Sequence, residues 1–165
     1  MMMTIEAEIS RRLSYSSGKV YWKDCSKPRF NGKEAGCKSK DGYFVVKMSG
    51  KVFKLHRVVW LLCKGKWPEG WLDHIDRDKS NNSIENLREV TFSQSNANRD
   101  KASKPKLSRY KGVSKNRYYT WKATIQGTFL GCFETEHLAA AAYNKAATKI
   151  FGEHAKLNVL ERYEE

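Results

Sequence analysis

The spacing of apolar residues in the first part of the chain changes between that of helices and that of strands. Apolar residues that recur every three or four positions predict helices at residues 5–13 and 56–64. Runs rich in valine and aromatic residues predict short strands at residues 19–23, 42–47 and 52–55. The turn at residues 48–51 joins the last two strands into a hairpin, and Gly65 ends the second helix.

Residues 71–98 have the pattern of a hairpin that leads into a helix. Trp71 and Leu72 are bulky apolar residues of a short strand, and the polar run DRDKSNN follows soon after them. The aspartate and asparagine side chains of this run favour a turn because they can bond their own backbone. A return strand is expected at residues 86–90, and the polar residues from Thr91 onward predict the start of a helix.

The second part of the chain has three strand-like runs before an alanine-rich helix. The runs lie at residues 109–115, 118–125 and 128–133. In the middle run Trp121, Ala123 and Ile125 alternate with polar residues, so one face of the sheet is expected to be apolar. Thr135 is expected to cap a helix that runs through Ile150, and its small alanines would let it lie close against the sheet.

Residues 101–108 are small, polar and lysine-rich with one proline, which is typical of a linker. We therefore predict two domains, at residues 1–100 and 109–160. The predicted fold class is α+β. A hairpin-and-helix domain would be followed by a three-stranded antiparallel sheet packed on one helix.

The charge of the chain narrows the class of partner. Its formal net charge is +13 and its pI is about 9.6. Dividing the sequence after residue 100 gives 19 basic against 12 acidic residues before the division and 12 against 6 after it, or +7 and +6. Both halves are positive, so a basic tail does not account for the charge. A polyanionic partner is favoured, with a solvated basic surface as the alternative.

The cysteines are widely spaced and form no CxxC pair. Neither a disulfide framework nor a structural zinc site is expected, and reduced thiols are the simple interpretation. No stretch approaches the roughly 18 apolar residues of a membrane span, and the N-terminus has no apolar signal core. We expect a soluble, cytoplasmic protein with no membrane partner.

Asp73 and His74 end the first strand of the predicted hairpin and are the candidate reactive pair. An imidazole can take a proton from water near neutral pH without a large pKa shift, and a carboxylate is a hard ligand for a divalent metal ion. Neighbouring strand residues point to opposite faces, so the strand is expected to twist or bend if both are to serve one site. The pair suits hydrolysis of a phosphodiester.

From residue 55 to residue 99 the chain resembles the HNH, or ββα-metal, nuclease motif of phage and intron-encoded homing endonucleases. The matching segments are KLHRVVW, DHID, NN, NLR and SQxxxNR. The resemblance implies that Asp73 binds the metal ion, that His74 is the general base, and that Asn86 braces the loop that aims the histidine. It also implies one divalent ion, Mg²⁺ first and Mn²⁺ as the alternative, a double-stranded DNA substrate and no small-molecule cofactor.

The remaining metal ligand of the family is an asparagine on the helix, and Ser95 occupies that position here. We expect Ser95 to bind the ion directly or through a water, assisted by Asn98, which matches a further family asparagine. Asn96 is the alternative, although one residue along a helix turns the side chain by about 100°. Three residues of the motif are expected to contact DNA: His56, Arg57 and Arg99. For His56 the alternative is a structural role.

Residues 109–158 resemble the ethylene-response-factor (ERF) type of DNA-binding domain, known from plant transcription factors and found fused to phage HNH nucleases. The matching segments are YKGV, WKATI, LGCF, AAAAYNKAA and FGEHAKLN. In that family the sheet enters the major groove. By position, the residues that would face DNA are Lys111, Ser114, Asn116, Tyr118, Lys122, Thr124, Gln126 and Phe129. Several of these positions are arginine or tryptophan in the plant proteins, so the plant target sequence does not transfer.

Together these patterns predict a metal-dependent DNA endonuclease that acts as a monomer and takes its site preference from the C-terminal domain. The alternative is a non-cleaving, DNA-binding transcriptional regulator with a degenerate nuclease domain. The intact DH and NLR segments argue against that alternative, and Ser95 argues for it.

Overall fold

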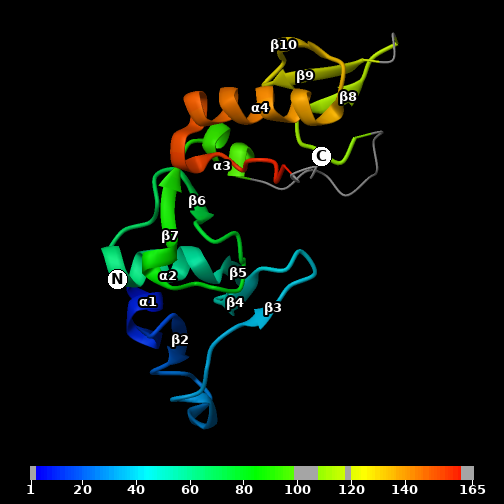
Figure 1. Cartoon of the computed structure of the whole chain (residues 1–165). Helices are drawn as coiled ribbons and strands as arrows, with labels where there is room; N and C mark the ends of the chain where they lie inside the picture. Colours follow the sequence, from blue (N-terminus) through cyan, green and yellow to red (C-terminus); the bar gives the residue numbers. More distant parts are fainter. Residues whose placement is uncertain (1–2, 99–107, 118–119, 161–165) are drawn as a thin grey trace. The chain divides into compact units, whose positions relative to one another are not determined.

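The computed structural model describes residues 3–98, 108–117 and 120–160. The chain forms two compact units that divide between Phe92 and Ser93 (Figure 1). Four α-helices and four small antiparallel sheets are present in the described residues, so the class is α+β, as predicted. No helix among these residues is long and apolar enough to cross a membrane.

The first unit begins with helix α1 (Ile5–Arg12), whose N-terminus is capped by the side chain of Thr4. The last apolar residue of the predicted helix, Leu13, instead starts strand β1 (Leu13–Ser16). This strand pairs with β2 (Lys19–Trp22) through a tight turn with positive φ at both of its central residues. β1 was not predicted from the sequence, because Leu13 also fits the helical spacing of the residues before it.

A three-stranded antiparallel sheet follows, in the order β3 (Cys37–Lys38), β4 (Phe44–Met48), β5 (Lys51–Lys54). Helix α2 (Leu55–Lys64) continues directly from β5 and ends at Gly65, which adopts the left-handed conformation with φ 74°. The predicted hairpin and the predicted helix are confirmed here.

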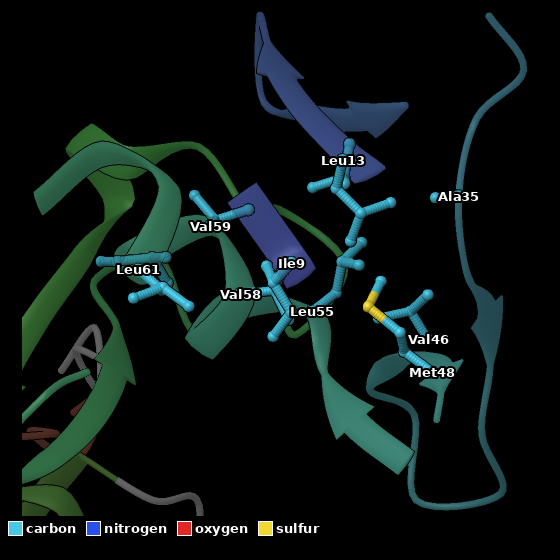
Figure 2. Packing of buried hydrophobic residues seen from close by; sticks show 11 residues of the cluster. Ile9, Leu13, Ala35, Val46, Met48, Leu55, Val58, Val59 and Leu61 are labelled. Atoms are coloured by element: carbon cyan, nitrogen blue, oxygen red, sulfur yellow. The ribbon is translucent and has the colours of Figure 1, made fainter. Parts of the chain in front are cut away.

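The core of the first unit consists of apolar side chains from its helices and strands. Its fully buried side chains come from α1, β1, β2, β4 and α2 (Figure 2): Ile9, Leu13, Val20, Val46, Val58, Val59 and Leu61. Burying a side chain of this size stabilises a fold by about 1.5–3 kcal/mol. Leu87 belongs to the same cluster, so the hairpin that contains Leu87 is anchored to the core.

The predicted hairpin consists of β6 (Trp71–His74) and β7 (Leu87–Val90), which pair antiparallel. The long loop between them ends in a 3₁₀ turn at Ile84–Asn86. The backbone N–H of Ile84 donates to the hydroxyl of Tyr15 on β1 at 3.0 Å. The first hairpin of the chain therefore supports the loop of this one.

The sheet of the second unit has the order β10 (Thr128–Phe133), β9 (Trp121–Ile125), β8 (Val113–Lys115) and is antiparallel throughout. Helix α4 (Glu136–Phe151) follows it, and the Oγ1 of Thr135 accepts from the backbone N–H of Leu138 at 3.2 Å. The predicted cap and helix are confirmed. Helix α3 (Phe92–Asn98) extends from the unit boundary into this unit.

Small residues let α4 lie close to the sheet. Ala139 and Ala140 of the helix are fully buried together with Ala123 of β9. A Cβ atom on Gly112 would lie 2.1 Å from the Tyr143 ring and 2.6 Å from the Thr124 carbonyl oxygen, and the φ of Gly112 is 74°. Only glycine fits at this position, both sterically and conformationally.

Two asparagines fix the segment that follows α4. Asn158 and Asn144 exchange two hydrogen bonds, each 2.8 Å long, between a side chain and a backbone group. The side chain of Asn158 also bonds the backbone of Lys111 twice, at 2.7 and 3.1 Å. The C-terminal segment is thereby tied both to the helix and to the residues that lead into β8.

Candidate functional site

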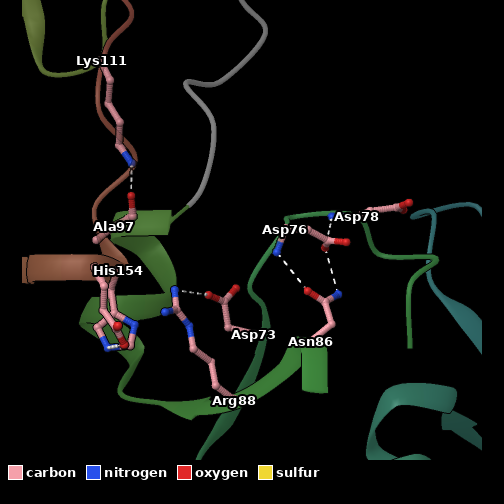
Figure 3. A network of polar contacts seen from close by, with 9 residues as sticks. Asp73, Asp76, Asp78, Asn86, Arg88, Ala97, Lys111 and His154 are labelled. Carbon is pink, nitrogen blue, oxygen red and sulfur yellow. Dashed lines mark hydrogen bonds and ion pairs between the residues drawn. The ribbon is translucent and has the colours of Figure 1, made fainter. Parts of the chain in front are cut away.

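Asp73 and Arg88 are directly opposed residues of the β6–β7 hairpin. A guanidinium nitrogen of Arg88 lies 3.5 Å from the Oδ2 of Asp73 (Figure 3), and the two side chains are only 16% and 14% exposed. Cross-strand neighbours of opposite charge attract each other, and partial burial reduces the screening by water. The arginine thus places a positive charge beside the proposed metal-binding carboxylate.

His74 is 4% exposed, and its Nε2 lies 3.2 Å from the Oδ1 of the buried Asn82. The orientation of the Asn82 amide follows from its other bond, in which Nδ2 donates to the carbonyl oxygen of Ser80 at 3.3 Å. Oδ1 is therefore the atom that faces the imidazole, and an oxygen can only accept. A neutral His74 must carry its proton on Nε2, which leaves Nδ1 as the basic nitrogen.

Two aromatic rings enclose His74. The centroid of the His56 ring is 5.2 Å from that of His74, edge to face, and the centroid of the Tyr43 ring is 6.1 Å away. Burial, reinforced by His74 and by two nearby cations, lowers the pKa of His56 to about 3. His56 is therefore neutral near pH 7. Its buried position supports the structural alternative considered from the sequence.

Two lysines cover Tyr43. The ammonium nitrogens of Lys54 and Lys79 lie 4.0 and 4.6 Å from the centre of the ring, within the range of cation–π attraction. Lys79 also donates to the carbonyl oxygen of Asp41 at 2.9 Å. Neither lysine was predicted to belong to the site, since the sequence shows only one lysine before α2 and another in the DRDKSNN run.

Asn86 braces the loop between β6 and β7. Its Nδ2 donates to Asp76 Oδ1 at 2.9 Å, and its Oδ1 accepts from the backbone N–H of Asp76 at 3.0 Å (Figure 3). Its Nδ2 also donates to the carbonyl oxygen of Asn81 at 2.9 Å. Burial acts to raise the pKa of Asp76, but hydrogen bonds from Asn81 and Asn86 outweigh it, and the pKa is lowered. The Asp76 carboxylate therefore stays charged and holds the loop.

The pairing of β6 with β7 runs through Asp73 and His74 without a register shift. Neighbouring side chains on such a strand point to opposite faces. Accordingly, Asp73 lies with Arg88, and His74 lies with Asn82, His56 and Tyr43. The expected bend is not seen in the pairing, so the two candidate residues belong to two adjoining clusters on one hairpin.

Helix α3 carries the candidate helix ligands. Asn98 is buried, and Ser95 and Asn96 are half-buried. Within the described ranges no three histidine, cysteine, aspartate or glutamate side chains gather in a way that could hold a metal ion. The candidate donors are instead a carboxylate with hydroxyl and amide oxygens. Oxygen donors of this kind suit a hard ion such as Mg²⁺.

The C-terminal sheet presents a polar face opposite its buried alanine and isoleucine. The register aligns Ser114 with Lys122, and Thr124 with Phe129, and these residues alternate with the buried ones. Phe129 is 58% exposed, and the ammonium of Lys122 lies 5.7 Å from its ring. Cys132, which pairs with Lys122, is also exposed. Cys132 was not among the predicted residues of this face, although its position between Gly131 and Phe133 in the strand places it there.

Three of the residues predicted to face DNA make contacts inside their own unit. Lys111 Nζ donates to the carbonyl oxygen of Ala97 at 2.6 Å, and Asn116 Nδ2 lies 3.3 Å from the sulfur of Cys132. The side-chain amide of Gln126 donates to the hydroxyl of Ser93. Arg57, from the first unit, lies 6.0 Å from the ring of Trp67. Two further predicted contacts, and the linker up to residue 107, lie outside the described residues: Arg99 and Tyr118.

A known protein family matches the part of the chain that contains the β6–β7 hairpin and its flanking helices. Residues 53–97 match the HNH endonuclease family. This segment is thus similar to an HNH endonuclease domain. It is also 35% identical over 128 residues to an uncharacterized HNH endonuclease of Acanthamoeba polyphaga mimivirus. That alignment covers 74% of this chain and 65% of the relative, so the chain spans slightly less than two thirds of the relative's length. No solved structure matches the chain.

The HNH segment begins in β5 and ends within α3, at Ala97. It includes Asp73, His74, Asn86 and Ser95, whereas Asn98 lies just beyond its end. The ERF-type resemblance of the C-terminal unit stays a prediction. Its sheet and helix have the predicted order and packing.

Proposed function

We propose that the protein is a metal-dependent DNA endonuclease of the homing type that hydrolyses phosphodiester bonds, with His74 as general base. The single observation that carries this proposal is the bond between His74 Nε2 and Asn82 Oδ1 inside an HNH domain. This bond leaves Nδ1 as the nitrogen that accepts a proton. Fixing the tautomer of a catalytic histidine is a recurrent requirement of hydrolytic enzymes.

In the proposed reaction the Nδ1 of His74 takes the proton of the attacking water. The imidazolium that forms keeps its second N–H bonded to Asn82 Oδ1, an acceptor that stabilises the positive charge. His56, in edge contact with the ring, is neutral and adds no repulsion. General-base catalysis of this kind typically contributes about 10²–10⁴-fold to the rate.

Asp73 is the proposed carboxylate ligand of one divalent metal ion, Mg²⁺ or alternatively Mn²⁺. Such an ion, when bound, neutralises the charge of the phosphate and of the leaving oxygen. Arg88 holds the Asp73 carboxylate from the opposite strand. The proposed helix ligand is Ser95, assisted by Asn98, with Asn96 as the alternative. Asn86 acts through the loop that it braces.

The exposed face of the C-terminal sheet is the proposed site of sequence preference on double-stranded DNA. Its lysine, hydroxyl and aromatic side chains suit phosphate and base contacts. The proposed contacts in this face are Ser114, Lys122, Thr124 and Phe129. Arg57, Arg99, Lys54 and Lys79 are proposed to meet phosphates near the HNH domain, and the protein would act as a monomer.

Incubation with supercoiled plasmid and Mg²⁺ tests the proposal. The parent protein should nick or linearise the plasmid, and His74→Ala should lose that activity. His137→Ala, which removes a histidine outside the HNH segment, should retain it. Equal cleavage by His74→Ala would refute the assigned base. A parent protein that binds the plasmid without cutting at any Mg²⁺ or Mn²⁺ concentration would favour the non-cleaving regulator.

A further inference from the structure

Helix α3 is the last element of the HNH segment and has only seven residues. An isolated helix of this length is unstable in water, because nucleation costs more than so few hydrogen bonds return. The last carbonyl groups of a helix also have no partner within it. α3 therefore depends on contacts from outside itself.

Those contacts come from the second unit. Ala97 is buried in one cluster with Ile125 of β9 and with three residues of α4: Tyr143, Ala147 and Phe151. The backbone N–H of Lys156, in the segment after α4, donates to the Ala97 carbonyl oxygen at 3.2 Å. At the other end of α3, Ser93 accepts from Gln126 in the β9–β10 turn. The helix is thus packed by residues that follow it in sequence by about thirty to sixty positions.

Lys111 completes this attachment. Its ammonium donates to the Ala97 carbonyl oxygen at 2.6 Å (Figure 3). It also donates to the carbonyl oxygen of Asn96 at 3.3 Å. A cation at the C-terminal end of a helix satisfies carbonyl groups and opposes the negative end of the helix dipole. The backbone of Lys111 is itself fixed by the side chain of Asn158. Both the backbone and the ammonium group of Lys111 therefore have hydrogen-bond partners.

We infer that the C-terminal unit is a structural part of the nuclease, and that Lys111 is a positioning residue for α3 and not a DNA contact. The C-terminal unit would then set the conformation of the helix that carries Ser95 and Asn98, besides binding DNA. The effect of this attachment on cleavage rests on the proposed function. The attachment of α3 to the C-terminal unit does not depend on that function.

Lys111→Met in the full chain tests the attachment, because methionine keeps much of the aliphatic stem and removes the charge and the donors. The matched control is Lys145→Met, on an exposed position of α4. We expect amide hydrogen exchange within residues 92–98 to become faster by about fivefold or more in Lys111→Met. Exchange there should be unchanged in Lys145→Met. Unchanged exchange in both variants would overturn the inference.

DNA binding separates this role from a phosphate contact. Loss of one phosphate contact reduces the slope of log K against log[salt] by about 0.9. Lys111→Met should leave that slope unchanged and should raise the Mg²⁺ concentration needed for half-maximal nicking. A reduced slope with normal exchange would identify Lys111 as a DNA contact and overturn the inference. If the parent does not cut DNA, the proposed function fails, while the exchange measurement still decides the role of Lys111.

Discussion

The Nε2 of His74 lies 3.2 Å from the Oδ1 of Asn82, and the two side chains are buried together. An oxygen acceptor at this position favours the imidazole tautomer with its proton on Nε2. Asn82 comes from the loop between β6 and β7, so the same loop that Asn86 braces also aims the proposed base. The position of the proposed base thus depends on this loop as well as on the strands.

Removing the acceptor should therefore change the tautomer of His74. In Asn82→Leu we expect the ¹⁵N chemical shifts of the His74 ring to move from those of an Nε2–H imidazole toward a mixture. Nicking should slow by roughly tenfold to a hundredfold, the usual effect of losing a group that orients a reactive histidine. Asn82→Asp keeps the acceptor and should keep the tautomer. An unchanged tautomer in Asn82→Leu would contradict this assignment.

The buried His56 should make the stability of the first unit depend on pH. Its pKa is lowered from 6.5 to about 3 by folding, so between these values the unfolded chain binds a proton that the folded chain does not. The free energy of unfolding should then fall as the pH is lowered through this window, by about 1.4 kcal/mol per pH unit at most. Above pH 6.5 this contribution is constant.

Urea unfolding of the parent and of His56→Phe between pH 4.5 and 7 measures that effect. Phenylalanine fills similar space and does not titrate, so the difference between the two proteins isolates His56 from the carboxylates. The parent should lose more stability toward low pH than the variant. Parallel curves would show that His56 does not take up its proton on unfolding.

Much of the fold follows from local sequence patterns. Thr135 before an alanine-rich run predicts the start of α4, and alternation around Trp121 predicts which face of β9 is buried. The predicted strand at Trp71 and Leu72 and its return strand also form a hairpin in the structure. In each case neighbouring residues in sequence are sufficient, because capping and alternation are local effects.

The contacts that the sequence did not predict involve side chains whose partners are far away in sequence. Lys111 and Gln126 lie at positions that face DNA in the resembled family, and here they also form hydrogen bonds with α3. No local sequence pattern predicts those hydrogen bonds. His56 is buried because Tyr43 and His74 pack against it from two other segments. β1 was not predicted because a local pattern was misleading: Leu13 fits the helical spacing, although the helix ends one residue earlier.

The exposed face of the C-terminal sheet offers a direct test of DNA binding. In a non-cleaving His74→Ala background, Lys122→Met should weaken duplex binding and reduce the salt slope by about 0.9, the value for one phosphate contact. Phe129→Ala should weaken binding without changing the slope, because it removes stacking or apolar contact and no charge. Neither variant should lower the melting temperature appreciably, since both side chains are exposed. Lys149→Met, on an exposed position of α4, is the control. If all three variants bind like the parent, another surface recognises the DNA.

Substitution of Ser95 tests the proposed helix ligand. A hydroxyl is a weaker metal ligand than an amide oxygen, so a site that relies on Ser95 should bind Mg²⁺ loosely. Ser95→Asn restores the residue of the resembled motif and should lower the Mg²⁺ concentration for half-maximal nicking. Asn98→Ala should raise that concentration, and Asn96→Ala should not, since it points about 100° away from Ser95 around the helix. Because Asn98 is buried, its variant needs a parallel unfolding measurement to separate lost ligation from lost stability. If Asn96→Ala alone raises the Mg²⁺ requirement, the ligand lies one position further along α3 than proposed.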